Sequence, residues 1–429
     1  MRSLLLIGFT VAASAATTPA NVTFHKDVLP VLQKNCQSCH RPGEAAPMSF
    51  ETYQQTRPWA KAIKQAVAAR TMPPWFADPA HGKWANDRTM TPDEIAVLVN
   101  WADTGAREGS AKDAPPPIKW TTGWGIGKPD LVVEMPQEYS VPSDGTVDYQ
   151  YVVLPTGLTE DRWVQMAEAR PGNRAIVHHI IAFVREPGSK WLADAKPGIP
   201  YVPKKGGDGG GSNEFLVGFA PGSPPEVLKP GRAKFLKAGS DLVLQMHYTA
   251  NGQAGKDRSS IGLVFAKQAP QQRVITSAVT TSKFAIPPGA GSYPVTASLT
   301  LQEDSDFISL LPHMHLRGKS FLYKAIYPSG ETEVLLNVPN YRFDWQLWYE
   351  FAQPKRMPKG TRIEVTGTFD NSPNNRFNPD PTKEVKWGEQ SWEEMMMGFF
   401  DVAIDVNMKP MDLFRPKKKP TQANTGGGL

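Results

Sequence analysis

The sequence predicts a small all-α N-terminal domain followed by a longer all-β region. Its 429 residues are enough for two to four domains. The 40 prolines and 36 glycines favour many turns and short strands over long helices. Helical patterns end before Pro115-Pro116-Pro117, and short β-branched and aromatic runs begin at Ile118. We therefore expect a stiff linker over residues 113–119 between the two regions.

The first 15 residues have the features of an export signal. Arg2 supplies the positive end, residues 4–12 form a short apolar core, and residues 13–15 form a small-residue cleavage site. The apolar core is too short to span a bilayer stably, because spanning takes about 20 residues. We expect a mature protein that begins near Ala16, has no stable membrane anchor, and is periplasmic or secreted.

The net charge of the chain gives no support to a nucleic-acid partner. The formal charge is only +5, and part of it comes from three lysines at 417–419. These lysines belong to a polar, glycine-rich tail, residues 416–429, that we expect to be disordered.

The only two cysteines of the chain lie in Cys36-Gln37-Ser38-Cys39-His40. This C-x-x-C-H pattern is typical of covalent c-type haem attachment. The two thiols add to the haem vinyl groups, and His40 is placed to ligate the iron. A redox-active cysteine pair and half of a zinc site are the alternatives. Neither needs the adjacent histidine, and zinc would need two more ligands nearby.

Methionine is a common second ligand of such a haem. Met72 follows a helix predicted over residues 59–70 and precedes two prolines, which would end the helix and hold the sulfur in an extended loop. Met48 is the rival, but it lies only eight residues after His40 and has less chain with which to reach the opposite haem face. We favour Met72, and Met48 stays an alternative.

Two further helices are predicted in the N-terminal domain. Residues 24–33 and 92–101 have helical patterns, and Thr91 is placed to cap the second helix ahead of a proline and two acids. With the haem motif and the methionine loop between them, they resemble the class I cytochrome c fold. The resemblance covers residues 22–112 and implies one covalent haem c.

The region after residue 118 is predicted to form antiparallel β-sandwiches or barrels. Runs such as 149–154, 261–265 and 362–366 are β-branched and aromatic, and Gly, Pro, Asn and Asp separate them. Roughly 300 residues are enough for two such units in series. We interpret the aromatic run 341–349 mainly as a buried strand, with a substrate wall as the alternative.

Five of the eight histidines lie in three short β-like segments of this region. His313 and His315 are two residues apart and would point to the same face of a strand. His178 and His179 are adjacent, and neighbours in a regular strand face opposite sides. They can therefore share a metal ion with His247 only if the backbone bends or bulges there.

These histidines combine with Gln245 and with Glu394-Met395 in a specific order. The series His-His, Gln-x-His, His-x-His and Glu-Met resembles the type II copper, ascorbate-dependent monooxygenases, which include the peptidylglycine α-hydroxylating and dopamine β-monooxygenases. The resemblance covers residues 120–412. It implies two jelly-roll-like β-sandwiches, over residues 120–285 and 286–415, that face each other across solvent with one copper each.

The resemblance also implies the copper ligands. The electron-accepting copper and the oxygen-binding copper would be held by His178, His179 and His247, and by His313, His315 and Met395, respectively. Met396 and Met397 beside Met395 leave the choice of thioether open. A thioether is a soft ligand that suits Cu(I) and that zinc rarely uses, so the second set of ligands argues for copper.

Other positions bear on the substrate. Gln245 matches a family position between the substrate and the electron-accepting copper, although an ordinary polar strand residue would look the same. Leu311 stands where the animal peptide enzyme has an arginine that holds the peptide carboxylate, and Phe399 replaces a tyrosine. The β-rich region has no cysteine, whereas the animal enzymes are disulfide-rich. A C-terminal peptide is therefore not the expected substrate.

We expect a copper-dependent monooxygenase that hydroxylates a C–H bond of a small organic substrate with O2. Electrons would pass from an external donor, ascorbate or a redox protein, through the fused haem to the first copper. Beyond the copper ligands and Gln245, no catalytic residue is predicted. The alternatives are a haem-copper electron-transfer or copper-binding protein on the same scaffold, and a structural sandwich whose only active part is the cytochrome.

Overall fold

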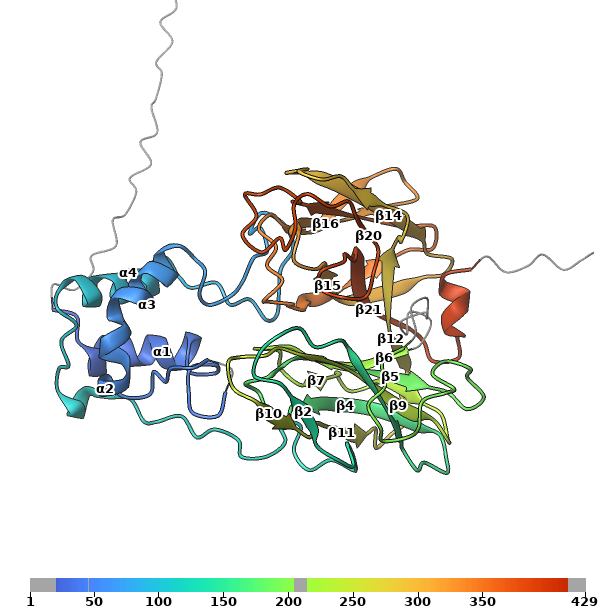
Figure 1. Cartoon of the computed structure of the whole chain (residues 1–429), viewed down its shortest axis with the longest axis horizontal. Helices are drawn as coiled ribbons and strands as arrows, with labels where there is room; N and C mark the ends of the chain where they lie inside the picture. The colour runs from blue at the N-terminus through green and yellow to red at the C-terminus, as the bar shows by residue number, and fades with distance from the viewer. Residues whose placement is uncertain (1–20, 45, 204–213, 416–429) are drawn as a thin grey trace, which may run out of the picture. The chain divides into compact units, whose positions relative to one another are not determined.

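The computed structural model describes residues 21–44, 46–203 and 214–415. The expected export signal and the tail from residue 416 lie outside the described residues. The chain divides into two compact units (Figure 1), residues 1–75 with 88–119 and residues 76–87 with 120–429. Residues 76–87, expected in the N-terminal domain, thus belong to the second unit. Among the described helices, none has the length and apolarity needed to cross a membrane.

The first unit is helical, as the sequence predicts. Thr91 caps the last long helix in a reciprocal box, in which its hydroxyl accepts from the Glu94 N–H and the Glu94 carboxylate accepts from the Thr91 N–H. The core of the unit includes Phe24, Leu98 and Trp101, all with no exposed surface. The helical segments are η1 (Phe24–Val28), α1 (Leu29–Asn35), α2 (Tyr53–Thr56), η2 (Arg57–Trp59), α3 (Ala60–Ala68), α4 (Pro92–Asp103) and η3 (Ala111–Asp113).

The second unit is β-rich, and its first part is a sandwich of two sheets. One sheet has the order β3-β9-β5-β6, and it packs against the strands β1-β11-β4-β8 through a shared apolar core. Two short strands, β2 and β10, pair beside it. The bounds are β1 (Leu131–Glu134), β2 (Tyr139–Val141), β3 (Gln150–Pro155), β4 (Arg162–Arg170), β5 (Val177–Arg185), β6 (Glu214–Phe219), β7 (Glu226–Val227), β8 (Arg232–Leu236), β9 (Asp241–Tyr248), β10 (Gly255–Asp257) and β11 (Ser260–Phe265).

The second part of the unit is another sandwich, with strand orders β14-β19-β16-β17 and β12-β21-β15-β18. Alternate residues of β16 and β19 are buried, as expected for strands with one face on a core. The bounds are β12 (Gln272–Thr280), β13 (Ala285–Ile286), β14 (Tyr293–Thr300), β15 (Ser305–His313), β16 (Gly318–Ile326), β17 (Thr332–Val338), β18 (Tyr349–Met357), β19 (Arg362–Phe369), β20 (Val385–Lys386), β21 (Met397–Asp405) and η4 (Pro410–Leu413).

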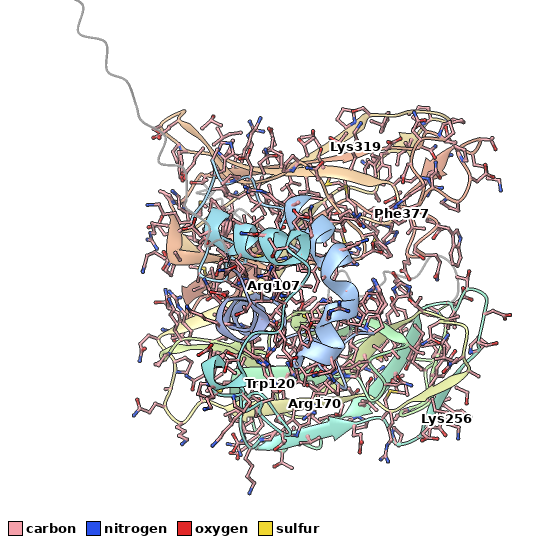
Figure 2. The ribbon with its side chains drawn as sticks, turned by 90° about the vertical axis from the view of Figure 1, so that its left-hand side faces the viewer. Arg107, Trp120, Arg170, Lys256, Lys319 and Phe377 are labelled. Carbon is pink, nitrogen blue, oxygen red and sulfur yellow. The ribbon has the colours of Figure 1, made fainter. Side chains whose placement is uncertain are left out.

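The two sandwiches share one sheet. β12 pairs in parallel with β8 over two residues, and this joins four strands of each sandwich into a nine-stranded sheet that also includes β7. β12 pairs with β21 over nine residues, so it belongs mainly to the second sandwich, although the sequence assigned residues up to 285 to the first. In Figure 2, Arg170 and Lys256 lie on strands of the first sandwich and Lys319 on a strand of the second.

The run 341–349 is not a strand, and that prediction was wrong. Residues 341–348 lie in a loop over residues 339–348, here called the crossover loop, which links β17 in one sheet to β18 in the other, and Tyr349 is the first residue of β18. Because the chain must cross between two sheets here, it cannot pair along either of them. One of its aromatic side chains, Phe343, instead packs against the histidines described next.

Candidate metal centres

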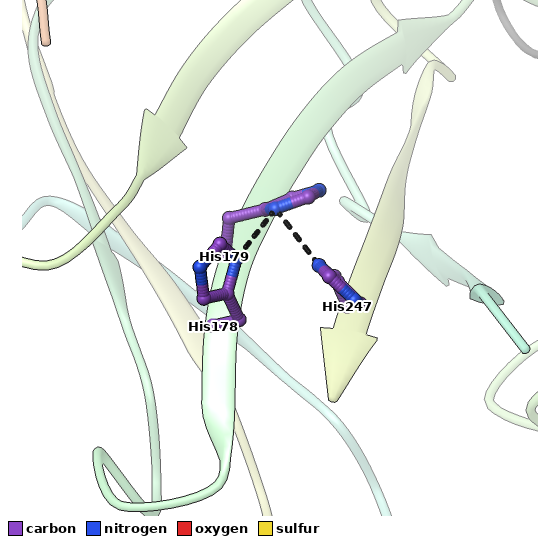
Figure 3. Close-up of side chains that lie close together, drawn as sticks. All are labelled: His178, His179 and His247. Atoms are coloured by element: carbon purple, nitrogen blue, oxygen red, sulfur yellow. Dashed lines mark hydrogen bonds between the residues drawn. The ribbon is translucent and has the colours of Figure 1, made fainter. Parts of the chain in front are cut away.

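Three histidines come together on one face of the first sandwich (Figure 3). The Nδ1 atom of His179 lies 3.3 Å from the Nδ1 atoms of both His178 and His247. One ligand atom from each ring lies within 4.8 Å of the others. His178 and His179 come from β5, and His247 comes from β9, which pairs directly with it. We call this set the first cluster.

A β-bulge makes this arrangement possible. Val177 pairs with Tyr248 and His179 pairs with His247, so His178 is an extra residue in β5. The extra residue bends the strand and brings two adjacent side chains to the same side. This is the bend that the sequence required if both histidines were to serve one metal ion.

The imidazoles of the first cluster are neutral near pH 7. Burial lowers the pKa of His178 and, together with the neighbouring histidines, holds the pKa of His179 and His247 well below the usual range. One Nδ1 atom cannot donate a proton to two neighbours at once. A cation between the three rings would satisfy all of these lone pairs, so the residues fit a metal ion bound through Nδ1.

A second pair of histidines lies at the end of β15. His313 is its last residue, and it pairs with Met397 of β21, so the two side chains share a face. Met396 points the other way, because it is fully buried and packs on Gly367 with Met314. Met397 is half-buried on the histidine face, and the half-buried Met395 precedes β21. Met396 is therefore unsuitable as a ligand, and Met395 and Met397 remain.

Hydrogen bonds select the other ring nitrogen in this second cluster, His313 and His315. The Nδ1–H of His313 donates to the Gln346 Oε1 at 2.8 Å, and the Nδ1–H of His315 donates to the Glu393 carbonyl at 3.2 Å. The lone pair of each ring is then on Nε2. The Nε2 atom of His315 is buried and has no hydrogen-bond partner within the described part of the chain. A metal ion bound through Nε2 fits this arrangement.

Burial also keeps these two rings neutral. It lowers the pKa of His313 to about 4 and that of His315 to about 3, the latter with a contribution from His313. Neutral imidazole is the form that binds metal ions. Both histidines also lower the pKa values of His179 and His247, which places the two clusters within electrostatic range of each other.

A buried carboxylate holds the backbone of the second cluster. Glu394 has no exposed surface and accepts hydrogen bonds from the N–H groups of His315 at 2.9 Å and Arg317 at 2.7 Å. Burial raises the pKa of Glu394 to about 8. The same residue precedes Met395, so one side chain links the histidine turn to the segment that carries the candidate thioethers.

The ring of Phe343 lies between the two clusters. It stacks on His178 at 5.3 Å and lies 6.2 Å from His247 and 6.0 Å from His315, between ring centroids. The resemblance implied two sites that face each other across solvent. In this structure, a side chain of the crossover loop occupies part of that space.

Gln245 and Tyr149 line the same face as the first cluster. Gln245 is buried and donates a hydrogen bond to the Tyr151 hydroxyl, which in turn donates to Glu389 at 3.4 Å. Tyr149 packs against His247 at 4.7 Å between ring centroids, and its buried hydroxyl has no partner among the described residues. The expected substrate-side role of Gln245 stays a prediction.

In the first unit, the C-x-x-C-H motif follows the end of α1. Cys36 is the C-cap residue of this helix, and both Cys36 and Cys39 are free and partly buried. Burial raises the pKa of Cys36 to about 12 and lowers the pKa of His40, whose ring stacks on Phe50 at 4.3 Å. Two free thiols beside a neutral imidazole fit covalent haem attachment.

Both candidate axial methionines, Met48 and Met72, are half-buried in the first unit. Met48 packs against the apolar core that contains Phe50. The choice between the two methionines therefore stays open.

The sequence did not indicate two residues of the site, Gln346 and Phe343. Both lie in the aromatic run that was interpreted as a strand. The only available signal was a lone glutamine between tryptophan and leucine in an otherwise apolar stretch. Its role depends on a contact with His313, 33 positions away.

Comparisons with known proteins add little. No family model matches the chain, and no curated protein matches it. It is similar to a structure of infectious bursal disease virus strain Gx, with 12% identity over 66% of this chain and 74% of that chain, at a TM-score of 0.18. Allantoicase from Saccharomyces cerevisiae aligns with 9% identity over 61% and 80%, at a TM-score of 0.17. Scores this low carry no argument about fold or function.

Proposed function

We propose that this protein is a copper-dependent monooxygenase that hydroxylates a C–H bond of a small organic substrate with O2. One observation carries the proposal. A three-histidine cluster and a two-histidine cluster with adjacent thioethers lie on either side of a single phenyl ring, Phe343, with all five imidazoles neutral.

The two sets of ligands differ in their donor atoms, and this difference suits two separate roles, electron storage and O2 activation. His178, His179 and His247 would hold a copper through Nδ1 atoms alone. His313 and His315 would hold another through Nε2, with Met395 or Met397 as a soft donor that favours Cu(I). Copper bound at these two centres would supply one-electron storage at the first and activation of O2 at the second.

The N-terminal unit is proposed to have the class I cytochrome c fold, and the two sandwiches are proposed to be jelly rolls. Cys36 and Cys39 would attach the haem, His40 would be one axial ligand, and Met72 or Met48 the other. A c-type haem and the expected export signal together favour a periplasmic or secreted location.

The electrons that hydroxylation requires give a reason for joining a haem unit to the copper-binding unit in one chain. Hydroxylation places one oxygen atom of O2 in the product and releases the other as water, which consumes two electrons and two protons from a donor. Ascorbate or a redox protein would supply these electrons through the haem. A tethered donor has an effective concentration in the millimolar range when the linker is short and flexible.

The position of Phe343 favours one alternative. Its ring occupies part of the space between the clusters, where a substrate would otherwise lie. A haem-copper electron-transfer protein would need no substrate space. It would show copper uptake and redox cycling without substrate-dependent oxygen consumption, so oxygen uptake separates the two functions.

Haem reoxidation tests the proposal without knowledge of the substrate. Reduced, copper-loaded protein is mixed with O2, and the haem absorption band is followed by stopped flow. We expect the His247→Ala variant to reoxidise at least about tenfold more slowly, because the first copper would be lost or weakened. Lys256→Ala, which changes an exposed residue of β10 outside both clusters, should behave as wild type. Equal rates in all three proteins would refute electron transfer from the haem to this centre.

A further inference from the structure

Residues 76–87 contact the second sandwich along an edge of its sheet. β18 is the last strand in the order of the nine-stranded sheet. The Ala85 N–H donates to the Glu350 carbonyl at 2.8 Å, and the Ala352 N–H donates to the Lys83 carbonyl at 2.8 Å. Trp84 thus forms an antiparallel bridge with Phe351. We call this segment the strap.

The strap holds the C-terminal stem of the crossover loop through its side chains. The Asn86 amide brackets Tyr349, because its Nδ2 donates to the Trp348 carbonyl at 2.8 Å and its Oδ1 accepts from the Glu350 N–H at 3.0 Å. The Trp84 ring stacks on Phe351 at 5.0 Å and meets Tyr349 edge-on at 5.5 Å. Backbone and side-chain contacts together fix the point where the loop enters β18.

The other end of the strap holds the N-terminal stem of the same loop. The Asp78 N–H donates to the Asn337 carbonyl at 2.8 Å, and the Asn337 amide donates to the Asp78 carboxylate at 3.1 Å. Asn337 is the penultimate residue of β17, just before the crossover loop begins. A twelve-residue segment therefore fixes both stems of one loop.

The crossover loop carries the groups that touch the candidate copper ligands. Gln346 accepts the hydrogen bond that sets the tautomer of His313, and Phe343 lies between the clusters. Tyr341 both accepts from the Met314 N–H at 3.0 Å and donates to the Met314 carbonyl at 2.7 Å, so it pins the residue between the two histidines. Displacement of either stem would move these contacts.

We propose that the strap positions the crossover loop, and through Gln346 and Phe343 sets the geometry of the second copper centre. The inference rests on the proposed function, because it assigns these contacts to a metal ligand set. The strap begins four residues after Met72, so the segment that carries a candidate haem ligand continues directly into it. Its residues are positioning residues, because the contacts described above join them to the two stems of the loop.

The test uses full-length holoprotein and the Cu(I) affinity of each centre, measured by competition with a chelator. Asn86→Ala removes both hydrogen bonds to the loop stem. We expect it to weaken the second centre by about tenfold, as the loss of a partner behind a metal ligand typically does. The first centre, with ligands on β5 and β9, should change much less. Lys83→Ala is the matched control, because that side chain is exposed and its carbonyl bond is kept.

A second variant distinguishes positioning from simple stabilisation. In a Gln346→Met background the hydrogen bond to His313 is already lost, so Asn86→Ala should weaken the second centre little further. If Asn86→Ala lowers the melting temperature but leaves the second-centre affinity at the Lys83→Ala value, the strap is only structural and the proposal is refuted. A wild-type protein that binds no copper would overturn the proposed function as well, and the two failures are thus distinguishable.

Discussion

At the residue scale, hydrogen bonds and burial decide which nitrogen of each histidine is available. Gln346 and the Glu393 carbonyl occupy Nδ1 of His313 and His315 and leave Nε2 free. In the first cluster, the Nδ1 atoms of His179 and His247 face each other at 3.3 Å. The first cluster therefore presents the Nδ1 atoms of its histidines to a metal ion, and the second cluster presents Nε2 atoms.

The same burial makes the metal-free protein sensitive to acid. His313 and His315 have folded-state pKa values of about 4 and about 3, below the unfolded value near 6.5. The unfolded chain therefore binds more protons between these limits, and stability falls as the pH drops below about 6.5. Each histidine contributes up to about 1.4 kcal/mol per pH unit in that window.

Urea unfolding of metal-free protein at pH 7 and pH 5 measures this effect. Other groups also titrate, so the informative quantity is the comparison with a His313→Gln, His315→Gln double variant. We expect wild type to lose more stability than the variant between the two pH values. An equal loss in both proteins would contradict the assignment of neutral, buried histidines.

At the element scale, strand alternation narrows the choice of thioether. β21 places Met397 opposite His313, and full burial of Met396 against Gly367 puts it on the other face. Successive side chains of a strand point to opposite faces. The sequence of three consecutive methionines does not show which of them faces the histidines, because that depends on the register in which β21 pairs with β15.

Three leucine variants test the assignment of the thioether. Met396→Leu should leave copper affinity unchanged and cost less than about 1.5 kcal/mol of stability, since it conserves volume in the core. Either Met395→Leu or Met397→Leu should selectively weaken Cu(I) binding at the second centre. Loss of affinity in Met396→Leu alone would contradict the register described here.

The elements show where sequence reasoning succeeds and where it fails. Local sequence signals were sufficient to predict where α4 begins, because Thr91 and Glu94 form their capping box within four residues. The need for a bulge at His178 also followed from strand geometry. The crossover loop could not be predicted, because its aromatic residues have a strand-like composition. Only the crossing between two sheets, a tertiary feature, excludes a strand there.

The position of the boundary between the two sandwiches also depends on contacts that are distant in the sequence. β12 reads as an ordinary strand, and nothing local to residues 272–280 says which sandwich it joins. Its nine-residue pairing with β21, more than a hundred positions away, decides the matter. Likewise, Gln346 became a candidate site residue only through its contact with His313.

At the scale of the whole molecule, the order of parts along the chain carries the functional argument. The C-x-x-C-H motif lies in one compact unit, and both histidine clusters lie in the other. The strap belongs to the second unit, although in the sequence it lies between two segments of the first unit. A truncated protein that begins at Trp120 would therefore lose the strap together with the C-x-x-C-H motif, and it would not test the role of the proposed haem alone.

Metal content measured by mass spectrometry directly tests whether the chain binds one haem and two copper ions. Full-length protein from a haem-maturing host, loaded with copper and freed of excess metal, is compared with a His313→Ala variant. We expect one haem and two coppers per chain in wild type, with the copper falling to about one in the variant because only the first cluster stays intact. One haem with no copper under copper-replete conditions would contradict this expectation.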